Sequence, residues 1–280
     1  KHLIYTILGN FLNKYGHFQL NPNYICNMIT QEIYKHNNNS SGIVIFIHGI
    51  AESPAPFSEQ MDIAYSCGYS VASIVLPGHG GSSLDFAHSN RKQWLEYSLQ
   101  TIDKYRQKYS KIVLFGHSMG GLLSVLAYTC NTEKITGIIA HDTPLYVFVR
   151  MRAVRNLLKI GLCNRINESD SAYNLLEYMG VEQGAALSYA LWLPRIADLF
   201  YLMRKTRSSL NKIRVPMLVL HADKDELVAK SSIKCFKRNV DSNYIKIINL
   251  TESSHFYIDS IDKATIKRQL KEFLLKQTNF

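Results

Sequence analysis

The stretch FGHSMGG, residues 115–121, is the part of the sequence that best predicts both the fold and a reactive residue. An apolar run, KIVLFG (111–116), leads into Ser118, and a helical pattern, MGGLLSVLAYTC (119–130), follows the serine at once. A serine between two glycines at the junction of a strand and a helix is typical of a nucleophile elbow. Gly116 and Gly120 remove the side chains that would collide in such a tight turn. The stretch therefore predicts Ser118 as a nucleophile, with a merely structural turn as the alternative.

Short β-branched runs alternate with helical patterns on both sides of this stretch. We expect strands at 28–34, 43–48, 70–76, 111–116, 135–140, 217–222 and 244–250. We expect helices at about 55–67, 91–108, 119–130, 230–239 and 261–276. Several runs are apolar throughout, as in strands buried on both faces, and the alternation predicts a mostly parallel, doubly wound sheet. The segment HNNNSSG (36–42) is interpreted as a hairpin-like loop.

One segment interrupts the alternation. Residues 145–212 contain no good strand and are interpreted as several short helices. A helical insertion of this size predicts a cap over the carboxyl ends of the strands, where open α/β sheets bind ligands. The expected organisation is a core made of residues 1–144 and 213–280, with a helical cap at 145–212.

A serine nucleophile needs a base and an orienting acid, which follow it along the chain in the order acid, then base. His255, in TESSHF, is the histidine that lies after the last expected strand. The segment HADKDELV offers three acids. We prefer Asp225, because the loop must turn before it presents its acid, and keep Asp223 as the second choice. Asp142, in AHDTP, is a further alternative or an Asx-type turn residue.

Two backbone N–H groups are needed to hold the oxyanion. One is expected from Met119, directly after the nucleophile, and the other from Ile50, in the loop IHGIAESP, where Gly49 permits close approach. The remaining histidines of interest receive structural interpretations. His221 is expected in the buried core and His117 with its side chain directed away, and other roles are expected for His48, His79 and His141.

Composition bounds the class of protein. The chain has 280 residues, 46% of them hydrophobic, and a net charge of +10 without a basic run or an aromatic–basic alternation, so no specific nucleic-acid partner is predicted. The five cysteines are widely spaced, which predicts reduced thiols and no zinc site. The opening Lys1–Phe18 stretch is too short and polar for a membrane span. We expect a cytoplasmic protein, with an upstream signal or anchor left open because the sequence starts at Lys1.

Five motifs occur in order: HGIAES (48–53), PGHGGS (77–82), GHSMGG (116–121), DELV (225–228) and SSHF (253–256). Over about residues 25–275 the chain thereby resembles the serine α/β-hydrolases of the monoacylglycerol lipase and lysophospholipase group. The resemblance implies an α/β-hydrolase fold, a triad of Ser118, Asp225 and His255, and an oxyanion hole at Ile50 and Met119. It implies no metal or organic cofactor. Glu52 matches an acidic residue of the family's oxyanion loop, with a role in loop structure or headgroup binding.

The resemblance also implies a substrate class, namely a small-molecule acyl ester of the lipid type, such as a monoacylglycerol or lysophospholipid. A small-ester carboxylesterase, an acyl thioesterase, an aminopeptidase and a non-catalytic binding protein are the alternatives. Candidate substrate-binding residues are Glu52, Leu145 and Trp192. Residues 145–212 carry ten lysines and arginines against five aspartates and glutamates. This basic cap is either a solvated surface or a lipid-facing lid in peripheral contact with an anionic membrane.

Overall fold

Seven strands form one sheet in the order β1-β3-β2-β4-β5-β6-β7. The computed structural model describes residues 31–38, 40–162, 166–184 and 186–278. Its strands are β1 (Ile33–Lys35), β2 (Gly42–Ile47), β3 (Ser70–Ser73), β4 (Lys111–His117), β5 (Ile135–His141), β6 (Met217–Ala222) and β7 (Ile245–Leu250). Every neighbouring pair is parallel except β1 and β3, so six strands present their carboxyl ends at one edge of the sheet.

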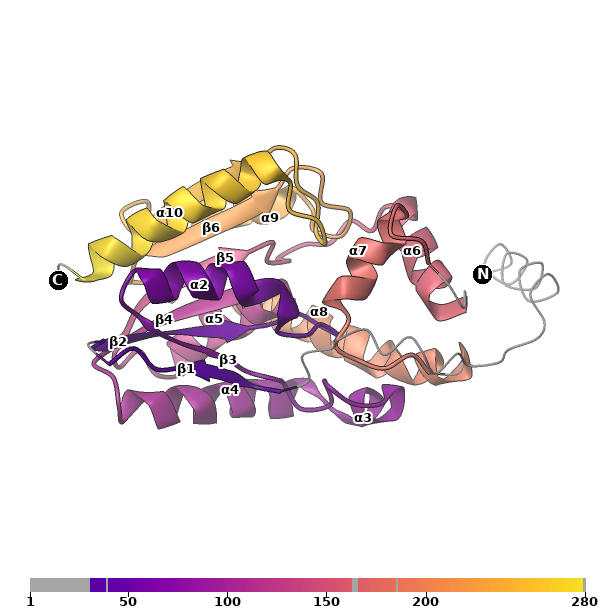
Figure 1. The fold of residues 1–280 in the computed structure, drawn as a ribbon, viewed down its shortest axis with the longest axis horizontal. Helices are drawn as coiled ribbons and strands as arrows, with labels where there is room; N and C mark the ends of the chain where they lie inside the picture. The colour runs from indigo at the N-terminus through magenta and orange to yellow at the C-terminus, as the bar shows by residue number, and fades with distance from the viewer. Residues whose placement is uncertain (1–30, 39, 163–165, 185, 279–280) are drawn as a thin grey trace.

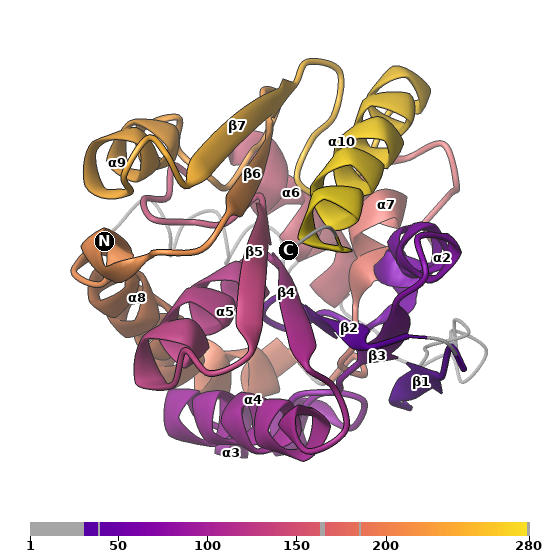
Figure 2. The same cartoon turned by 90° about the vertical axis from the view of Figure 1, so that its left-hand side faces the viewer.

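Helices cover both faces of this sheet. The helices are α2 (Ser58–Ser66), α3 (Ser83–His88), α4 (Arg91–Arg106), α5 (Met119–Cys130), α6 (Met151–Leu162), α7 (Ser171–Tyr178), α8 (Leu193–Arg207), α9 (Ser231–Asn239) and α10 (Ser260–Thr278). Short 3-10 helices are η1 (Ala55–Phe57), η2 (Ala186–Trp192) and η3 (Leu210–Lys212). Helices α2 and α10 lie on one face, and α4, α5 and α9 lie on the other (Figure 2).

The apolar strands account for this two-faced core. Along β2, Ile43, Ile45 and Ile47 pack with the helices α4 and α5, whereas Val44 and Phe46 pack with α2 and α10. Successive side chains of a strand point to opposite faces, so a strand covered on both sides must be apolar at every position. The central strand β4 is buried in the same way, and the apolar run before Ser118 is therefore a central strand of the sheet.

The expected alternation of strands and helices is confirmed in the described residues, with two differences. The hairpin-like interpretation of 36–42 is wrong, because β1 pairs antiparallel with β3 and not with β2. Helix α3 was not expected. Ser82 and Asp85 cap its start reciprocally, which lets a six-residue helix form without a long apolar pattern. The opening stretch 1–18, Cys26 and Cys163 lie outside the described residues, as does part of the strand expected at 28–34.

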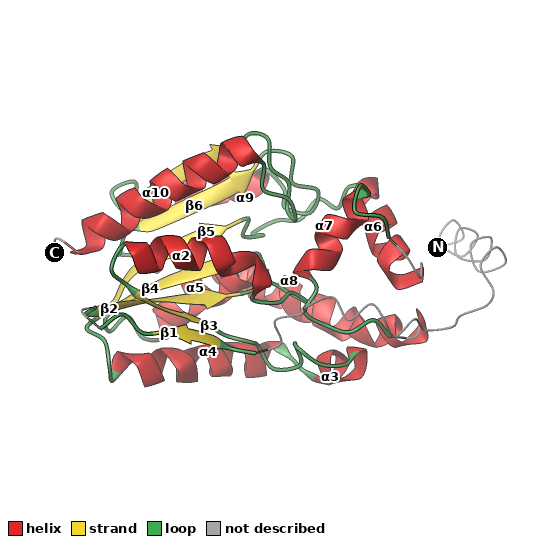
Figure 3. Cartoon of the chain, viewed as in Figure 1, coloured by secondary structure: helices red, strands yellow, loops and turns green. Residues whose placement is uncertain are grey.

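The helices of the described part of 145–212 are α6, α7, α8, η2 and η3, and they pack in two different ways. Helices α6 and α7 stand apart from the sheet at its carboxyl edge (Figure 3). They share a small apolar cluster of their own, which includes Ile160, Leu175 and Leu176. Helix α8 runs from this region back to the body (Figure 1), where Leu202 and Met203 join the main core. Helices α6 and α7 therefore form the outer part of this segment, bonded to the loop after β2 through Tyr178 and Gly180, whereas α8 packs on the core.

Candidate active site

The elbow at Ser118 has the backbone that its sequence predicts. Ser118 has φ 51° and ψ −120°, a strained conformation for a residue with a side chain, and its N–H donates to the His141 carbonyl at 2.9 Å. A Cβ on Gly120 would lie 1.8 Å from the Ile47 carbonyl oxygen, and one on Gly116 would lie 2.2 Å from the backbone of Gly120. Both glycines are therefore required by close contact, and the turn presents Ser118 at the start of α5.

Three side chains from distant parts of the chain form a continuous hydrogen-bonded relay. The Ser118 Oγ lies 3.2 Å from Nε2 of His255, and Nδ1 of His255 lies 2.7 Å from Oδ2 of Asp225. All three residues are buried. The runner-up acid, Asp223, instead faces the Lys230 ammonium at 3.8 Å. Geometry thus selects Asp225 from the three acids of its loop.

The loop after β6 holds Asp225 ready for this contact. Its Oδ1 accepts the backbone N–H groups of Leu227 and Val228, both at 2.7 Å, which leaves Oδ2 for His255. Burial opposes ionisation, but His255 and these N–H donors outweigh it and lower the pKa of Asp225. Burial alone would lower the pKa of His255, whereas the negative charge of Asp225, its hydrogen bond to the ring and the charge of Glu52 raise it. An ionised Asp225 therefore stabilises the positive charge that His255 acquires when it takes up a proton.

The loop after β2 is fixed by contacts on either side of Ile50. Gly49 N–H donates to Oε2 of Glu52 at 2.7 Å, and Ala51 N–H donates to Nε2 of His79 at 3.0 Å. Gly180, just after α7, donates its N–H to the Ala51 carbonyl at 2.8 Å. Within the described part of the chain, the N–H groups of Ile50 and of Met119 have no hydrogen-bond partner. Both groups are therefore free to donate, and an oxyanion hole requires two such donors.

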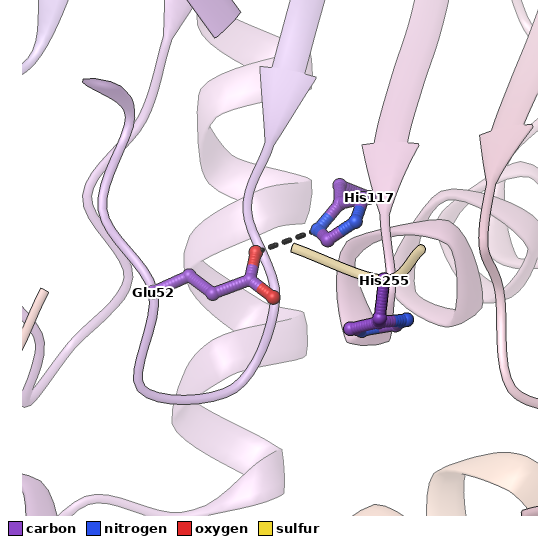
Figure 4. A group of neighbouring side chains, drawn as sticks. All are labelled: Glu52, His117 and His255. Carbon is purple, nitrogen blue, oxygen red and sulfur yellow. Dashed lines mark hydrogen bonds and ion pairs between the residues drawn. The ribbon is translucent and has the colours of Figure 1, made fainter. Parts of the chain in front are cut away.

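Sequence reasoning missed one buried cluster. His117 was expected to point away from the site, but its Nδ1 lies 2.8 Å from Oε2 of Glu52, and its ring lies 5.0 Å from that of His255 (Figure 4). Although burial opposes it, the contact with His117 lowers the pKa of Glu52. The three residues offer ligand atoms within 4.8 Å of one another, as a metal would require. Oε2 of Glu52, Nδ1 of His117 and both ring nitrogens of His255 are engaged in hydrogen bonds within the site, so we interpret the cluster as a Glu52–His117 pair beside His255.

A cavity of about 590 Å³ leads from Ser118 and His255 into the cap. Its lining comes from the oxyanion loop and from α6, α7 and α8, and is almost entirely aliphatic or aromatic. Among the described lining residues the acidic side chains are Glu52 and Glu226, and none is a lysine or arginine. This volume and character are typical of a pocket for an apolar small molecule.

The candidate substrate-binding residues lie in different places. Trp192 lines the cavity and donates its ring N–H to the Ser83 carbonyl at 3.1 Å. Glu52 also lines the cavity but holds Gly49 and His117. Leu145 is not part of the lining, and its candidacy is wrong. It is fully buried in the main core, because the chain turns inward there between β5 and the cap.

Comparisons with known proteins agree with this architecture. The family described as serine aminopeptidase, S33, matches residues 38–166. Phospholipase YtpA of Bacillus subtilis is 26% identical over 204 residues, covering 68% of this chain and 78% of that protein. The thermostable monoacylglycerol lipase of a Bacillus species is 23% identical over 244 residues, covering 83% and 90%.

The fold is shared with solved structures as well. A soluble variant of monoglyceride lipase from Saccharomyces cerevisiae superimposes with a TM-score of 0.68 at 18% identity, covering 88% of this chain and 91% of that one. The sheet order, the elbow and these relatives agree with the resemblance predicted from the motifs. The chain is therefore an enzyme with an α/β-hydrolase fold, a serine esterase or lipase that is similar to a phospholipase and to monoacylglycerol lipases.

Proposed function

We propose that the chain hydrolyses the carboxylic ester of a single-chain lipid, such as a monoacylglycerol or lysophospholipid, through an acyl-enzyme on Ser118. The observation that carries the proposal is the relay from Ser118 through His255 to Asp225 at the wall of an apolar cavity of about 590 Å³. The relay supplies an activated nucleophile. The cavity supplies a place for an acyl chain.

In the first half of the reaction, His255 Nε2 takes the proton of Ser118 as the Oγ attacks the ester carbonyl carbon. The carbonyl π bond opens, and the resulting oxyanion accepts the N–H groups of Ile50 and Met119. Collapse of this intermediate expels the alcohol, which leaves with the proton from His255. Asp225 holds the ring through Nδ1 and stabilises its positive charge during both proton transfers.

In the second half, water replaces the alcohol. His255 removes a proton from the water as its oxygen attacks the acyl carbon, and the same two N–H groups hold the second oxyanion. Ser118 then leaves with the proton from His255, and the fatty acid is released. The high pKa that the nearby carboxylates confer on His255 favours each step that forms the imidazolium.

The cavity favours a lipid over a peptide. An aminopeptidase must bind the ammonium group of its substrate, for which it needs an accessible acid. Both acids of the described lining are buried and already bonded, since Glu52 is held by Gly49 and His117 and Glu226 accepts the backbone N–H of His255 at 3.3 Å. The apolar lining instead matches an acyl chain, whose transfer from water gains about 0.8 kcal/mol per buried methylene group.

The mouth of the cavity supports a further proposal, peripheral contact with an anionic membrane. Exposed apolar side chains surround it, with Val149 and Leu157 on one side and Leu193, Ile196 and Phe200 on the other. Three exposed arginines lie on or beside α6, at positions 150, 152 and 155. Apolar residues with a basic rim favour the surface of an anionic bilayer. None of the described helices has an apolar stretch long enough to cross a bilayer.

A vesicle assay tests the membrane contact. Reversing Arg152 and Arg155 to glutamate is expected to reduce sedimentation with phosphatidylglycerol vesicles at least tenfold, because each basic residue near the surface contributes about 1 kcal/mol. The matched control is Lys108→Glu, an exposed charge just before β4, at the opposite edge of the sheet. Equal loss in the control, or equal binding to uncharged phosphatidylcholine vesicles, contradicts the contact.

The substrate class is tested with nitrophenyl esters of two to sixteen carbons, using Ser118→Ala as the control. We expect maximal kcat/KM at eight carbons or more, with the activity lost in the variant, followed by turnover of monoacylglycerol or lysophosphatidylcholine. A maximum at two to four carbons indicates a small-ester carboxylesterase. Faster turnover of an acyl-CoA than of the matched ester indicates a thioesterase. No activity that depends on Ser118 indicates a binding protein.

A further inference from the structure

A second carboxyl group lies behind the relay. Asp142 follows β5 directly and is fully buried. Its backbone has φ 44°, which is uncommon for a residue with a side chain, and its N–H donates to the Leu220 carbonyl at 2.9 Å. Its Oδ1 accepts the N–H of Ala222 at 2.7 Å. The side chain is therefore pinned across the end of β6, beneath the loop that carries Asp225.

This position brings Asp142 within reach of the proposed base. One carboxyl oxygen of Asp142, one of Asp225 and one ring nitrogen of His255 all lie within 4.8 Å of one another. Asp225 makes the direct 2.7 Å hydrogen bond, and Asp142 makes none to the ring. Two neighbouring strand ends thus aim a carboxyl group at the same imidazole, and only one of them is engaged.

The two acids differ in charge because of where they lie. Burial and the negative charge of Asp225 raise the pKa of Asp142 well above its usual range. Two buried carboxylates at this separation do not both ionise. The groups that face Asp142 are His141 and His221, at 3.5 and 3.6 Å, together with Asp225, Glu226 and His255. In this setting Asp225 is the ionised acid and Asp142 the neutral one.

We propose that Asp142 is a reserve acid of the relay, a positioning residue that orients His255 when the side chain of Asp225 is absent. The inference rests on the proposed role of Ser118 and His255. Removal of the Asp225 carboxylate takes away a charge that opposes ionisation of Asp142 and leaves Nδ1 of His255 without its acceptor. Asp142 then ionises and accepts that N–H, directly after a small ring movement or through one water molecule in the space left by Asp225.

The test compares two replacements of Asp225, one that fills the space of its side chain and one that leaves this space empty. Asp225→Asn keeps the volume, blocks Asp142 and presents an uncharged amide, so we expect a loss in kcat of about 10⁴, the size seen when a triad acid is made an amide. Asp225→Ala opens the space, and we expect a loss of no more than about 100-fold. The double variant Asp142→Asn with Asp225→Ala is expected to fall to the level of Asp225→Asn. Asp142→Asn alone is expected to lose at most about tenfold.

A pH profile separates this role from a merely structural one. The activity of Asp225→Ala is expected to rise with pH in two steps, one as Asp142 ionises and one as His255 loses its proton. The double variant is expected to keep the His255 step and to lose the Asp142 step. Asp223→Asn serves as the control on the same loop, with unchanged activity, because Asp223 faces Lys230 and not His255. Thermal unfolding of each variant shows that the chain is folded.

The outcomes distinguish this inference from the proposal on which it rests. If Asp225→Ala loses as much as Asp225→Asn, or if adding Asp142→Asn changes nothing, the reserve role is refuted. If Ser118→Ala retains the wild-type activity, the proposed mechanism fails before the acids are considered. Selective rescue of Asp225→Ala by the presence of Asp142 supports both.

Discussion

Replacing Glu52 by glutamine removes a buried negative charge beside His255 and keeps the shape of the side chain. Glu52 and His255 offer ligand atoms no more than 4.8 Å apart. At that distance, with an effective dielectric constant of about 20, two unit charges interact by about 3.5 kcal/mol. This energy corresponds to about 2.5 pH units in the pKa of the histidine. Because Glu52 raises the pKa of His255, its neutralisation must lower that pKa.

The expected result is a displaced pH profile. Hydrolysis requires neutral His255, so kcat/KM rises with pH through the pKa of this group. In Glu52→Gln that rise is expected at a pH lower by one to about 2.5 units. The maximal kcat is expected to fall about tenfold or more, since hydrogen bonds to a charged acceptor are worth about 1.5–3 kcal/mol and Gly49 beside Ile50 loses one.

The assay is nitrophenyl ester hydrolysis from pH 5 to pH 10, with Glu182→Gln as the matched control. Glu182 is exposed on the same side of the molecule and is expected to leave the profile in place. An unmoved or raised pKa in a folded Glu52→Gln variant refutes the reasoning, because the charge is then not coupled to His255. A lower kcat with an unmoved pKa assigns Glu52 to loop structure alone.

Three further changes test the contacts around the site. Gly180→Val is expected to destabilise the fold by about 1–3 kcal/mol and to lower kcat, because its Cβ would lie 2.0 Å from the Glu52 carbonyl oxygen. Thermal unfolding and turnover measure the two effects, and an unchanged melting temperature contradicts the contact. His79→Ala removes the acceptor of the Ala51 N–H, so kcat is expected to fall about 10-fold while KM changes little; a change confined to KM argues against a role in holding the oxyanion loop. Leu175→Trp fills part of the cavity and is expected to lower activity on twelve-carbon esters at least tenfold more than on two-carbon esters. An equal loss at all ester lengths shows that the acyl chain of the substrate does not occupy this region.

Much of the fold could be predicted because its signals are local. A central strand covered by helices on both faces must be apolar along its length. Consecutive apolar residues, such as those of β2 and β4, therefore indicate such a strand. Pairing of strands is not local. The partner of β1 is β3, more than thirty residues away, and the adjacent loop suggests a hairpin that does not form. Helix α3 was not predicted because a reciprocal cap stabilises it, and it has no long periodic apolar pattern.

In the candidate site, too, the residues with local sequence signals could be predicted and the others could not. The sequence by itself determined the elbow, since the strand, the two glycines and the helix around Ser118 are contiguous, and chain order pointed to His255. Only the tertiary structure decided between Asp223 and Asp225, turned His117 toward Glu52, and removed Leu145 from the cavity. It also placed Asp142 beside the relay. The physical reason is that a side chain's partner depends on distances across the folded core, which residues far apart in the sequence set together.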